Sequence, residues 1–249
     1  GLVLSGGGTR GFAHLGVYKA MKEFGIEPDV ITGVSAGSIA GAFIADGQDP
    51  EKTMEILANH KLFDFLELSI PKQGLVQMGG FEKALKKRLK AKTFEDLKIP
   101  LIVFAVNMNK AKLSRFDSGD LILAVKASSA VPVVFSPVRI GDDFFLDGGI
   151  IDNFPTQELV GRCKTIIGVN VHPIGEVRDL GNLRKIAERT FHILLRHQAK
   201  GKEKDCDIYI EPEGLEQYGM MDVSHAHEVF ELGYRSAVKA LEASTISRE

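Results

Sequence analysis

Two consecutive strand–turn–helix units at the start of the chain constrain its fold more than any other feature. The first runs from a short apolar stretch, Leu2–Ser5, through a glycine loop into a helical pattern over Phe12–Phe24. The second runs from the β-favouring Val30–Thr32 through a glycine-flanked turn into small, apolar residues that begin at Ala36. Short apolar runs are typical of strands buried on both faces, and right-handed crossovers join such strands into a parallel sheet. We therefore predict an α/β fold with a mostly parallel central sheet.

The rest of the chain continues to alternate between strand and helix patterns. We expect further strands at 100–107, 112–117, 165–171 and 207–210, and a strand pair turning at 141–143. Helices are expected from residue 49 onward and at 81–89, 120–128, 180–200 and 225–243, with an apolar stretch at 62–70 and a loop at 71–80. The alternation favours one domain over residues 1–249.

Composition argues against several classes of protein. The 249 residues are 44% hydrophobic, and a net charge of −2 gives no basic field for nucleic acid. The two cysteines, Cys163 and Cys206, favour neither a disulfide framework nor a zinc site. The apolar runs are shorter than the roughly 18 residues of a membrane span, and no signal-peptide pattern precedes the first strand. We expect a cytoplasmic protein; since the sequence begins at Gly1 rather than at Met, removal of a targeting segment stays open.

The second turn carries a candidate nucleophile. It reads Gly33-Val34-Ser35-Ala36-Gly37, a Gly-x-Ser-x-Gly string between a predicted strand and a predicted helix. On such an elbow the serine occupies a strained bend, and the flanking glycines allow strand and helix to approach closely. The free N–H groups at the start of the helix favour a developing oxyanion. Ser35 is therefore the candidate, although in a chain with 26 glycines the string is also that of an ordinary tight turn.

The first turn, Gly6-Gly7-Gly8-Thr9-Arg10-Gly11, is a candidate anion-binding loop. A dinucleotide fold needs an acidic residue at the end of the second strand, but Asp29 precedes that strand. A phosphate-binding Walker loop needs a Lys-Ser or Lys-Thr pair after its last glycine, and none follows. What remains is a loop whose backbone N–H groups face an anion at a helix N-terminus, as an oxyanion hole requires. Arg10 either steadies this loop or binds an anionic headgroup.

Two residues are candidates for the base that a serine hydroxyl needs. His172, at the end of a predicted strand, is the best placed of the seven histidines for a Ser-acid-His order. Asp147 lies at a strand-to-turn junction and is followed by Gly148 and Gly149. A carboxylate in a partly dry pocket can accept the serine proton directly, but the same string is also that of a simple Asp-Gly turn. The residues alone leave both bases open.

Taken in order, these motifs resemble the bacterial patatin-like phospholipase family. The glycine loop, the serine turn and Asp147-Gly148-Gly149 are accompanied by Ala127-Ser128-Ser129-Ala130-Val131-Pro132, Phe135, Pro137, Asn153-Phe154-Pro155 and Glu231-Leu232-Gly233-Tyr234. The resemblance spans at least residues 2–155. It implies a three-layer α/β/α fold of the FabD/lysophospholipase-like kind and a Ser-Asp dyad in place of a triad.

The resemblance also implies roles for individual residues. Ser35 is the nucleophile, Asp147 is the base, and the amides of Gly6, Gly7 and Gly8 form the oxyanion hole. The supporting loop and elbow comprise Arg10, Gly11, Gly33, Gly37, Gly148 and Gly149. The implied activity is that of a serine acyl-ester hydrolase of lipids, of the phospholipase A, lysophospholipase or esterase type, without metal or cofactor.

The lipid substrate leads to two further expectations. A lid or acyl pocket is expected in roughly residues 59–93, where no residue can be matched to the family, and peripheral contact with a membrane surface is expected. The basic helix at 81–89 presents either a solvated charged face or a surface that meets anionic lipid.

Two other functions are compatible with the same residues. An acyltransferase would pass the acyl group from Ser35 to an acceptor alcohol or thioester instead of water. A non-catalytic lipid-binding or regulatory module would keep the pocket but would need neither Ser35 nor Asp147.

Overall fold

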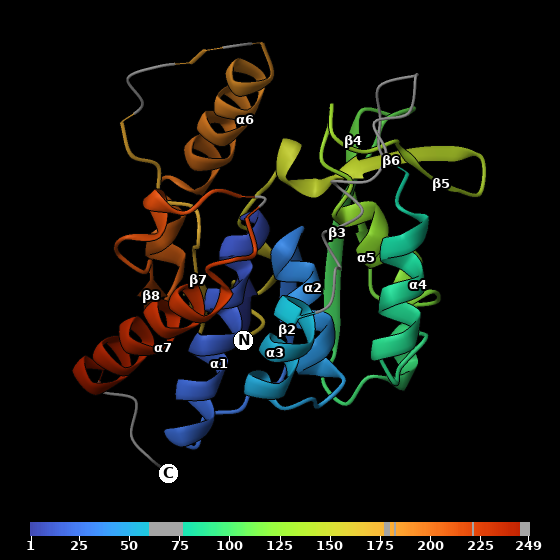
Figure 1. The fold of residues 1–249 in the computed structure, drawn as a ribbon. Coiled ribbons are helices and arrows are strands. Elements are labelled where there is room, and N and C mark those ends of the chain that lie inside the picture. Colours follow the sequence, from blue (N-terminus) through green and yellow to red (C-terminus); the bar gives the residue numbers. More distant parts are fainter. Residues whose placement is uncertain (60–76, 177–179, 182, 221, 245–249) are drawn as a thin grey trace.

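A computed structural model describes residues 1–59, 77–176, 180–181, 183–220 and 222–244 (Figure 1). The strands are β1 (Leu2–Leu4), β2 (Ile31–Val34), β3 (Leu101–Asn107), β4 (Lys112–Phe116), β5 (Val138–Ile140), β6 (Asp143–Asp147), β7 (Ile167–Val169) and β8 (Ile208–Ile210). The α-helices are α1 (Phe12–Glu23), α2 (Ala36–Ala45), α3 (Pro50–Asn59), α4 (Gly79–Arg88), α5 (Leu121–Ser128), α6 (Leu183–Ala199) and α7 (Ala226–Ala243). The apolar stretch at 62–70 and the first part of the expected loop, 71–76, lie outside the described residues.

The strands form one sheet in the order β5-β6-β3-β2-β1-β7-β8, with β4 also paired to β3. The central strands β3, β2, β1, β7 and β8 run parallel, whereas β4 and β6 are antiparallel to β3. Helices flank this sheet (Figure 1), so the predicted mostly parallel α/β architecture is confirmed. The C-terminal ends of the parallel strands lie together at one end of the sheet, which is where ligands of open α/β sheets bind.

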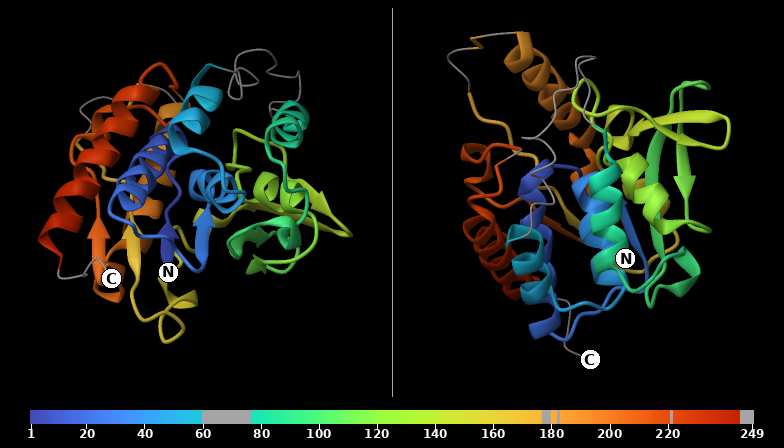
Figure 2. Two further views of the ribbon diagram at one scale, coloured as in Figure 1. Left: turned by 90° about the horizontal axis from the view of Figure 1, so that it is seen from below. Right: turned by 45° about the vertical axis from the view of Figure 1, so that its right-hand side comes forward.

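Side-chain alternation along β1 shows how the two faces of the sheet are buried. Leu2 and Leu4 belong to the main core, which helices α1, α2 and α7 cover. Val3 points to the other face, where it packs in a smaller cluster with Phe154 and Ala199. Figure 2 shows α1, α3 and α7 gathered on one side of the sheet. The second face is covered by residues 154–166 and by the C-terminal end of α6.

Strand β3 brings the two halves of the candidate site together. Along one edge of β3, Val34 of β2 pairs with Phe104, and further along β3 Asp147 of β6 pairs with Ala105. Strand β4 occupies the opposite edge over Val103–Asn107, so β6 continues the edge that β2 leaves. Ser35, the residue after Val34, therefore faces the end of β6.

Helices α1 and α7 cross at two glycines. A Cβ at Gly16 would lie 2.0 Å from the Phe230 carbonyl oxygen, and one at Gly233 would lie 2.2 Å from the Ala13 carbonyl oxygen. Because neither glycine has a side chain, the two backbones come into direct contact. This contact holds the C-terminal helix against the helix that follows the glycine loop.

Candidate active site

Ser35 lies on the expected elbow between β2 and α2. Its backbone has φ 52° and ψ −122°, a conformation that non-glycine residues rarely adopt. The Ser35 carbonyl accepts the N–H of Ser38 at 2.9 Å at the start of α2, and the residue as a whole is 8% exposed. A serine in this strained conformation between a strand and a helix is what a nucleophile elbow requires.

Asp147 ends β6 and is fully buried. Its Oδ1 accepts the Gly149 N–H at 2.8 Å, whereas its Oδ2 has no hydrogen-bond partner among the described residues. Burial raises the pKa of Asp147 from 3.8 to about 6, against the opposing influence of the Ser35 hydroxyl and the Gly149 N–H. Ser35 is thus near enough to affect this pKa, although it forms no hydrogen bond to Oδ2. The free oxygen and the raised pKa suit a group that accepts and returns a proton near neutral pH.

The glycine loop leaves two backbone donors free. The Gly6 N–H donates to the Asn153 carbonyl at 3.3 Å, whereas the amides of Gly7 and Gly8 have no acceptor in the described part of the chain. Gly8 has φ +59°, and a Cβ there would lie 2.2 Å from the Met220 carbonyl oxygen. The loop is therefore held in a conformation that only glycine adopts without strain, with two amides left for an anion.

The glycines assigned to the supporting loop and elbow all lie at close contacts. A Cβ at any of them would come within 2.7 Å of another atom: Gly11, Gly33, Gly37, Gly148 and Gly149. At Gly37 the obstructing atom is the Leu4 carbonyl oxygen of β1, at 2.2 Å. The start of α2 is therefore packed directly on the strand that leads into the glycine loop.

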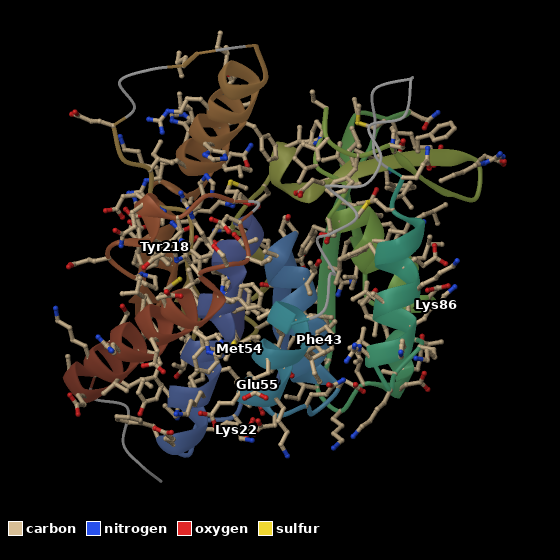
Figure 3. The ribbon with its side chains drawn as sticks, in the orientation of Figure 1. Lys22, Phe43, Met54, Glu55, Lys86 and Tyr218 are labelled. Carbon is tan, nitrogen blue, oxygen red and sulfur yellow. The ribbon has the colours of Figure 1, made fainter. Side chains whose placement is uncertain are left out.

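Arg10 is buried and fastens the glycine loop to the C-terminal part of the chain. Its guanidinium donates to the carbonyls of Pro173, Glu216 and Tyr218, at 2.8, 3.3 and 2.9 Å. Burial lowers the pKa of Arg10 to about 10. Figure 3 labels Tyr218, in the segment before α7. Of the two roles considered for Arg10, this geometry corresponds to steadying the loop.

The two histidines nearest to the loop segments are buried in neutral form. His172 Nε2 lies 3.3 Å from the His192 carbonyl oxygen, and burial with the nearby charges lowers its pKa to about 3. His14 Nε2 lies 2.9 Å from the Ser5 carbonyl oxygen, and burial lowers its pKa to about 4. Among the described residues, neither histidine is hydrogen-bonded to Ser35 or Asp147, whereas Ser35 lies close enough to Asp147 to affect its pKa.

Three further residues brace the site without having been assigned a role from the sequence. The Ser35 N–H donates to Ser128 Oγ at 2.9 Å, and the Asp147 N–H donates to the Ala130 carbonyl at 2.9 Å. The last residue of α5 and the segment directly after it thus hold both candidate catalytic residues. Gln198 of α6 donates to the Ile150 carbonyl at 2.7 Å and accepts the Asn153 N–H at 3.0 Å. Ser128 and Ala130 lie in a stretch that the family resemblance includes, whereas nothing in the sequence pattern marks Gln198.

A small apolar groove includes Ala36, the residue that follows Ser35. It is lined by Gly8, Thr9, Gly11, Phe12, Leu15, Ala36, Ile39, Ala40 and Leu57. These residues come from the glycine loop and helices α1, α2 and α3, that is, from before the 59–93 region in which an acyl pocket was expected. Residues 60–76 of that region lie outside the described part of the chain.

No described helix is both long and apolar enough to cross a membrane. Among the described residues, no three His, Cys, Asp or Glu side chains are grouped so that they could hold a metal ion.

The fold and the elbow define an α/β protein with a serine on a strand-to-helix turn beside a buried carboxyl group. Residues 2–160 match the family described as patatin-like phospholipase. The chain belongs to this family, and the resemblance seen in its sequence motifs is confirmed.

Known relatives of the chain come from fungi and bacteria. Lysophospholipase NTE1 of Kluyveromyces lactis is 26% identical over 270 residues, which cover 94% of this chain and 18% of the relative. An uncharacterized NTE family protein of Mycobacterium tuberculosis is 31% identical over 183 residues, which cover 72% of this chain and 51% of the relative. The chain therefore spans less than a fifth of the fungal protein and about half of the mycobacterial one.

A solved structure shows the same fold. VipD from Legionella pneumophila superposes with a TM-score of 0.59 at 19% sequence identity, covering 98% of this chain and 66% of that chain.

Proposed function

We propose that this protein is a serine acyl-ester hydrolase of lipids, of the phospholipase A, lysophospholipase or esterase type, that uses a Ser35–Asp147 dyad. The single observation that carries the proposal is the elbow itself. A strained serine faces a buried carboxyl group whose pKa is raised to about 6 and whose Oδ2 is unpartnered. Membership of the patatin-like phospholipase family and the similarity to lysophospholipase NTE1 of Kluyveromyces lactis support the same class of reaction.

In the first half of the reaction, the Ser35 hydroxyl attacks the ester carbonyl carbon while Asp147 Oδ2 accepts its proton. The new oxyanion receives hydrogen bonds from the amides of Gly7 and Gly8, and the positive end of α2 adds to its stabilisation. When the tetrahedral intermediate collapses, Asp147 returns the proton to the departing alcohol. An acyl-Ser35 ester remains.

In the second half, water takes the place of the alcohol. Asp147 removes a proton from the water as the water oxygen attacks the carbonyl carbon of the acyl-serine. The amides of Gly7 and Gly8 then stabilise the second oxyanion. Collapse releases the fatty acid and returns the proton to Ser35. One carboxyl group serves as base and acid in both halves, so the scheme requires no histidine.

The apolar groove supports an acyl chain as the part of the substrate that is bound. The groove is lined by the apolar side chains of Phe12, Leu15, Ile39 and Leu57. It also includes Ala36, which follows Ser35, and Gly8, whose amide is free. An acyl chain bound along this lining would lie close to the elbow, because Ala36 follows Ser35 directly. Each methylene buried there contributes about 0.8 kcal/mol to binding.

The decisive test is labelling and turnover of matched variants. Wild-type protein is expected to react with a fluorophosphonate probe and to hydrolyse a panel of lipid esters, including a lysophospholipid. Ser35→Ala is expected to lose labelling and to lower turnover by a factor on the order of 10⁴. Ser114→Ala, on β4 away from the elbow, is the control and should behave as wild type.

The products distinguish hydrolysis from the alternatives. Free fatty acid without a competing acceptor indicates hydrolysis, whereas acyl transfer to an added alcohol in preference to water would indicate an acyltransferase. Lipid binding with neither turnover nor Ser35-dependent labelling would refute the proposal in favour of a binding module.

A further inference from the structure

Large apolar side chains on the described surface are concentrated at the end of the sheet where the parallel strands terminate, beside Ser35 and Asp147. This end is called the Ser35–Asp147 edge. Those that the structure shows exposed are Met108, Val133, Phe144, Ile151, Val160, Leu180, Ile186, Ile193 and Leu194. Met108 directly follows the C-terminal end of β3, and its N–H donates to the Phe144 carbonyl at 2.8 Å. Val133 follows Ala130, whose carbonyl accepts the Asp147 N–H, and Ile151 follows the short turn after Asp147.

Val160 marks the opposite edge. Its neighbour Leu159 lies against Gly1, at the start of β1, where a Cβ would come within 2.7 Å of Leu159 Cδ1. Val160 is 46% exposed, so its exposure is similar to that of the other exposed apolar residues although it lies elsewhere. The Ser35–Asp147 edge thus carries an apolar surface that its far side lacks in the described residues.

Helix α6 contributes the largest part of this surface. Ile186, Ile193 and Leu194 are 44%, 50% and 48% exposed, and their spacing of seven and eight residues places them on one face of the helix. Figures 1 and 2 show α6 projecting beyond the end of the sheet, at the same end of the molecule as the β5–β6 hairpin.

The inner face of α6 contacts the segment that carries Asp147. Leu195 is buried, and its Cδ2 would lie 2.7 Å from a Cβ on Gly149. Gln198 bonds to the Ile150 carbonyl and the Asn153 N–H, as described above. One helix therefore has its buried face on the candidate catalytic loop and an apolar face exposed to solvent.

The charge of α6 indicates what covers the exposed face. Within residues 183–199 the sequence has four basic residues (Arg184, Lys185, Arg189, Arg196) and one acidic residue (Glu188), and the exposed Lys200 follows directly. The segment is therefore basic overall, although Arg196 pairs with Glu211 and Arg189 donates to the Gly175 carbonyl. An amphipathic helix with exposed aliphatic residues and an excess of Lys and Arg is typical of segments that lie in the interface of an anionic bilayer.

Helix α4, the other candidate for lipid contact, has a different surface. The side chains that it exposes are those of Lys83, Lys86 and Lys87, and its apolar residues Phe81 and Leu85 are buried in the core. Figure 3 shows Lys86 on the outer side of the helix. This face has charge but no aliphatic side chain to insert, so it fits a solvated surface better than a docking surface.

We propose that the exposed face of α6, together with Met108, Val133, Phe144 and Ile151, is the surface on which this protein docks to a lipid bilayer that carries anionic headgroups. The proposal rests on the proposed function, because a lipid ester hydrolase must reach substrate that is held in a membrane. Docking on this surface turns the Ser35–Asp147 edge toward the bilayer, so that an acyl chain can pass from lipid to groove without crossing water.

The test compares two matched variants of the 249-residue chain on vesicles of phosphatidylcholine mixed with phosphatidylglycerol. Ile193→Ser combined with Leu194→Ser removes exposed aliphatic side chains from α6, and Val160→Ser removes one from the opposite edge. Sedimentation with vesicles is expected to show at least about a tenfold loss of binding for the α6 variant and none for Val160→Ser. The ratio of turnover on vesicles to turnover on a soluble short-chain ester should fall with the binding.

Circular dichroism melting of each variant checks that the fold is kept, as is expected for side chains already half exposed. Absence of vesicle binding by the wild-type chain, or equal binding by wild type and the α6 variant, would overturn the docking surface. Vesicle binding that depends on α6, combined with no hydrolysis of any ester, would sustain the surface and refute the proposed hydrolase instead.

Discussion

Burial of the Asp147 carboxyl group lowers the stability of the fold at neutral pH and also suits this group to act as a base. Burial raises its pKa to about 6, while only two groups, the Gly149 N–H and the Ser35 hydroxyl, favour its charged form. A base with a pKa near the working pH is charged often enough to accept a proton and still acidic enough to return it. Two measurable consequences follow from this one residue.

The first consequence is the pH dependence of hydrolysis. The carboxyl group must be charged to act as base, so kcat/KM is expected to be half-maximal near the pKa of Asp147, about 6, and to fall about tenfold per pH unit below it. An imidazole would ordinarily titrate in the same range, but the pKa values of His172 and His14 are lowered to about 3 and 4. The acid limb should therefore survive in His172→Gln and vanish, with the activity, in Asp147→Asn. Loss of the limb in His172→Gln with activity kept in Asp147→Asn would restore a histidine base.

The second consequence is a change in stability. Between pH 3.8 and about 6, an unfolded Asp147 has lost its proton while the folded one keeps it, so the free energy of unfolding falls as the pH rises through this window. Above pH 6 the loss is complete and amounts to about 3 kcal/mol. Asp147→Asn is therefore expected to be more stable than wild type at neutral pH, by up to that amount, and equally stable below pH 3.8. Urea unfolding of wild type and Asp147→Asn at neutral pH and below pH 3.8 measures this difference in the free energy of unfolding. A variant that is less stable than wild type at neutral pH would contradict the prediction.

At the scale of elements, residues of helices α1, α2 and α3 line the apolar groove, so the size of their side chains is expected to limit the acyl chain that it holds. Ala40 and Leu57 both line the groove, one small and one large. Exchanging their sizes should therefore move the preferred acyl-chain length in opposite directions.

Ala40→Leu is expected to lower kcat/KM for long-chain esters by about fourfold per excluded methylene, with little effect on short ones, because each methylene is worth about 0.8 kcal/mol. Leu57→Ala is expected to shift the preference toward longer chains, while losing about 2–5 kcal/mol of folding stability through the cavity. A chain-length profile of kcat/KM for both variants checks this. Parallel shifts, or none, would show that the acyl chain binds elsewhere.

The elements themselves could be predicted from the sequence because their signals are local. Asp120, a residue type that favours helix N-caps, accepts the Leu123 N–H at 2.8 Å and caps α5. Gly37 must be glycine because the Leu4 carbonyl oxygen would lie 2.2 Å from a Cβ there. The pairing of β6 with β3 had no local signal. Its register depends on residues about 40 positions apart, and it is this pairing that brings Asp147 to Ser35. The contact of Gln198 with the candidate catalytic loop was missed for the same reason.

At the scale of the whole molecule, the site depends on residues beyond the family match at 2–160. The carbonyls that receive Arg10 belong to Pro173, Glu216 and Tyr218, and β7 completes the sheet beside β1. Helix α7 in turn packs on α1, the helix that follows the glycine loop. The C-terminal third is therefore expected to unfold together with the rest, as one cooperative unit.

The crossing of α1 and α7 gives a direct measure of that cooperation. Gly16→Ala and Gly233→Ala each place a methyl group within 2.2 Å of a carbonyl oxygen on the opposite helix, so each is expected to destabilise the fold by about 2–3 kcal/mol. Both substitutions push the same two helices apart. Once one methyl group has separated the helices, the second causes a smaller steric clash and therefore a smaller loss of stability. The double variant should therefore lose at least about 1 kcal/mol less than the sum of the single losses. Because α1 follows the glycine loop, ester turnover should fall with each substitution, whereas the exposed control Arg235→Ala should change stability by no more than about 0.5 kcal/mol. Strictly additive losses in urea unfolding would show that the two glycines act at independent contacts.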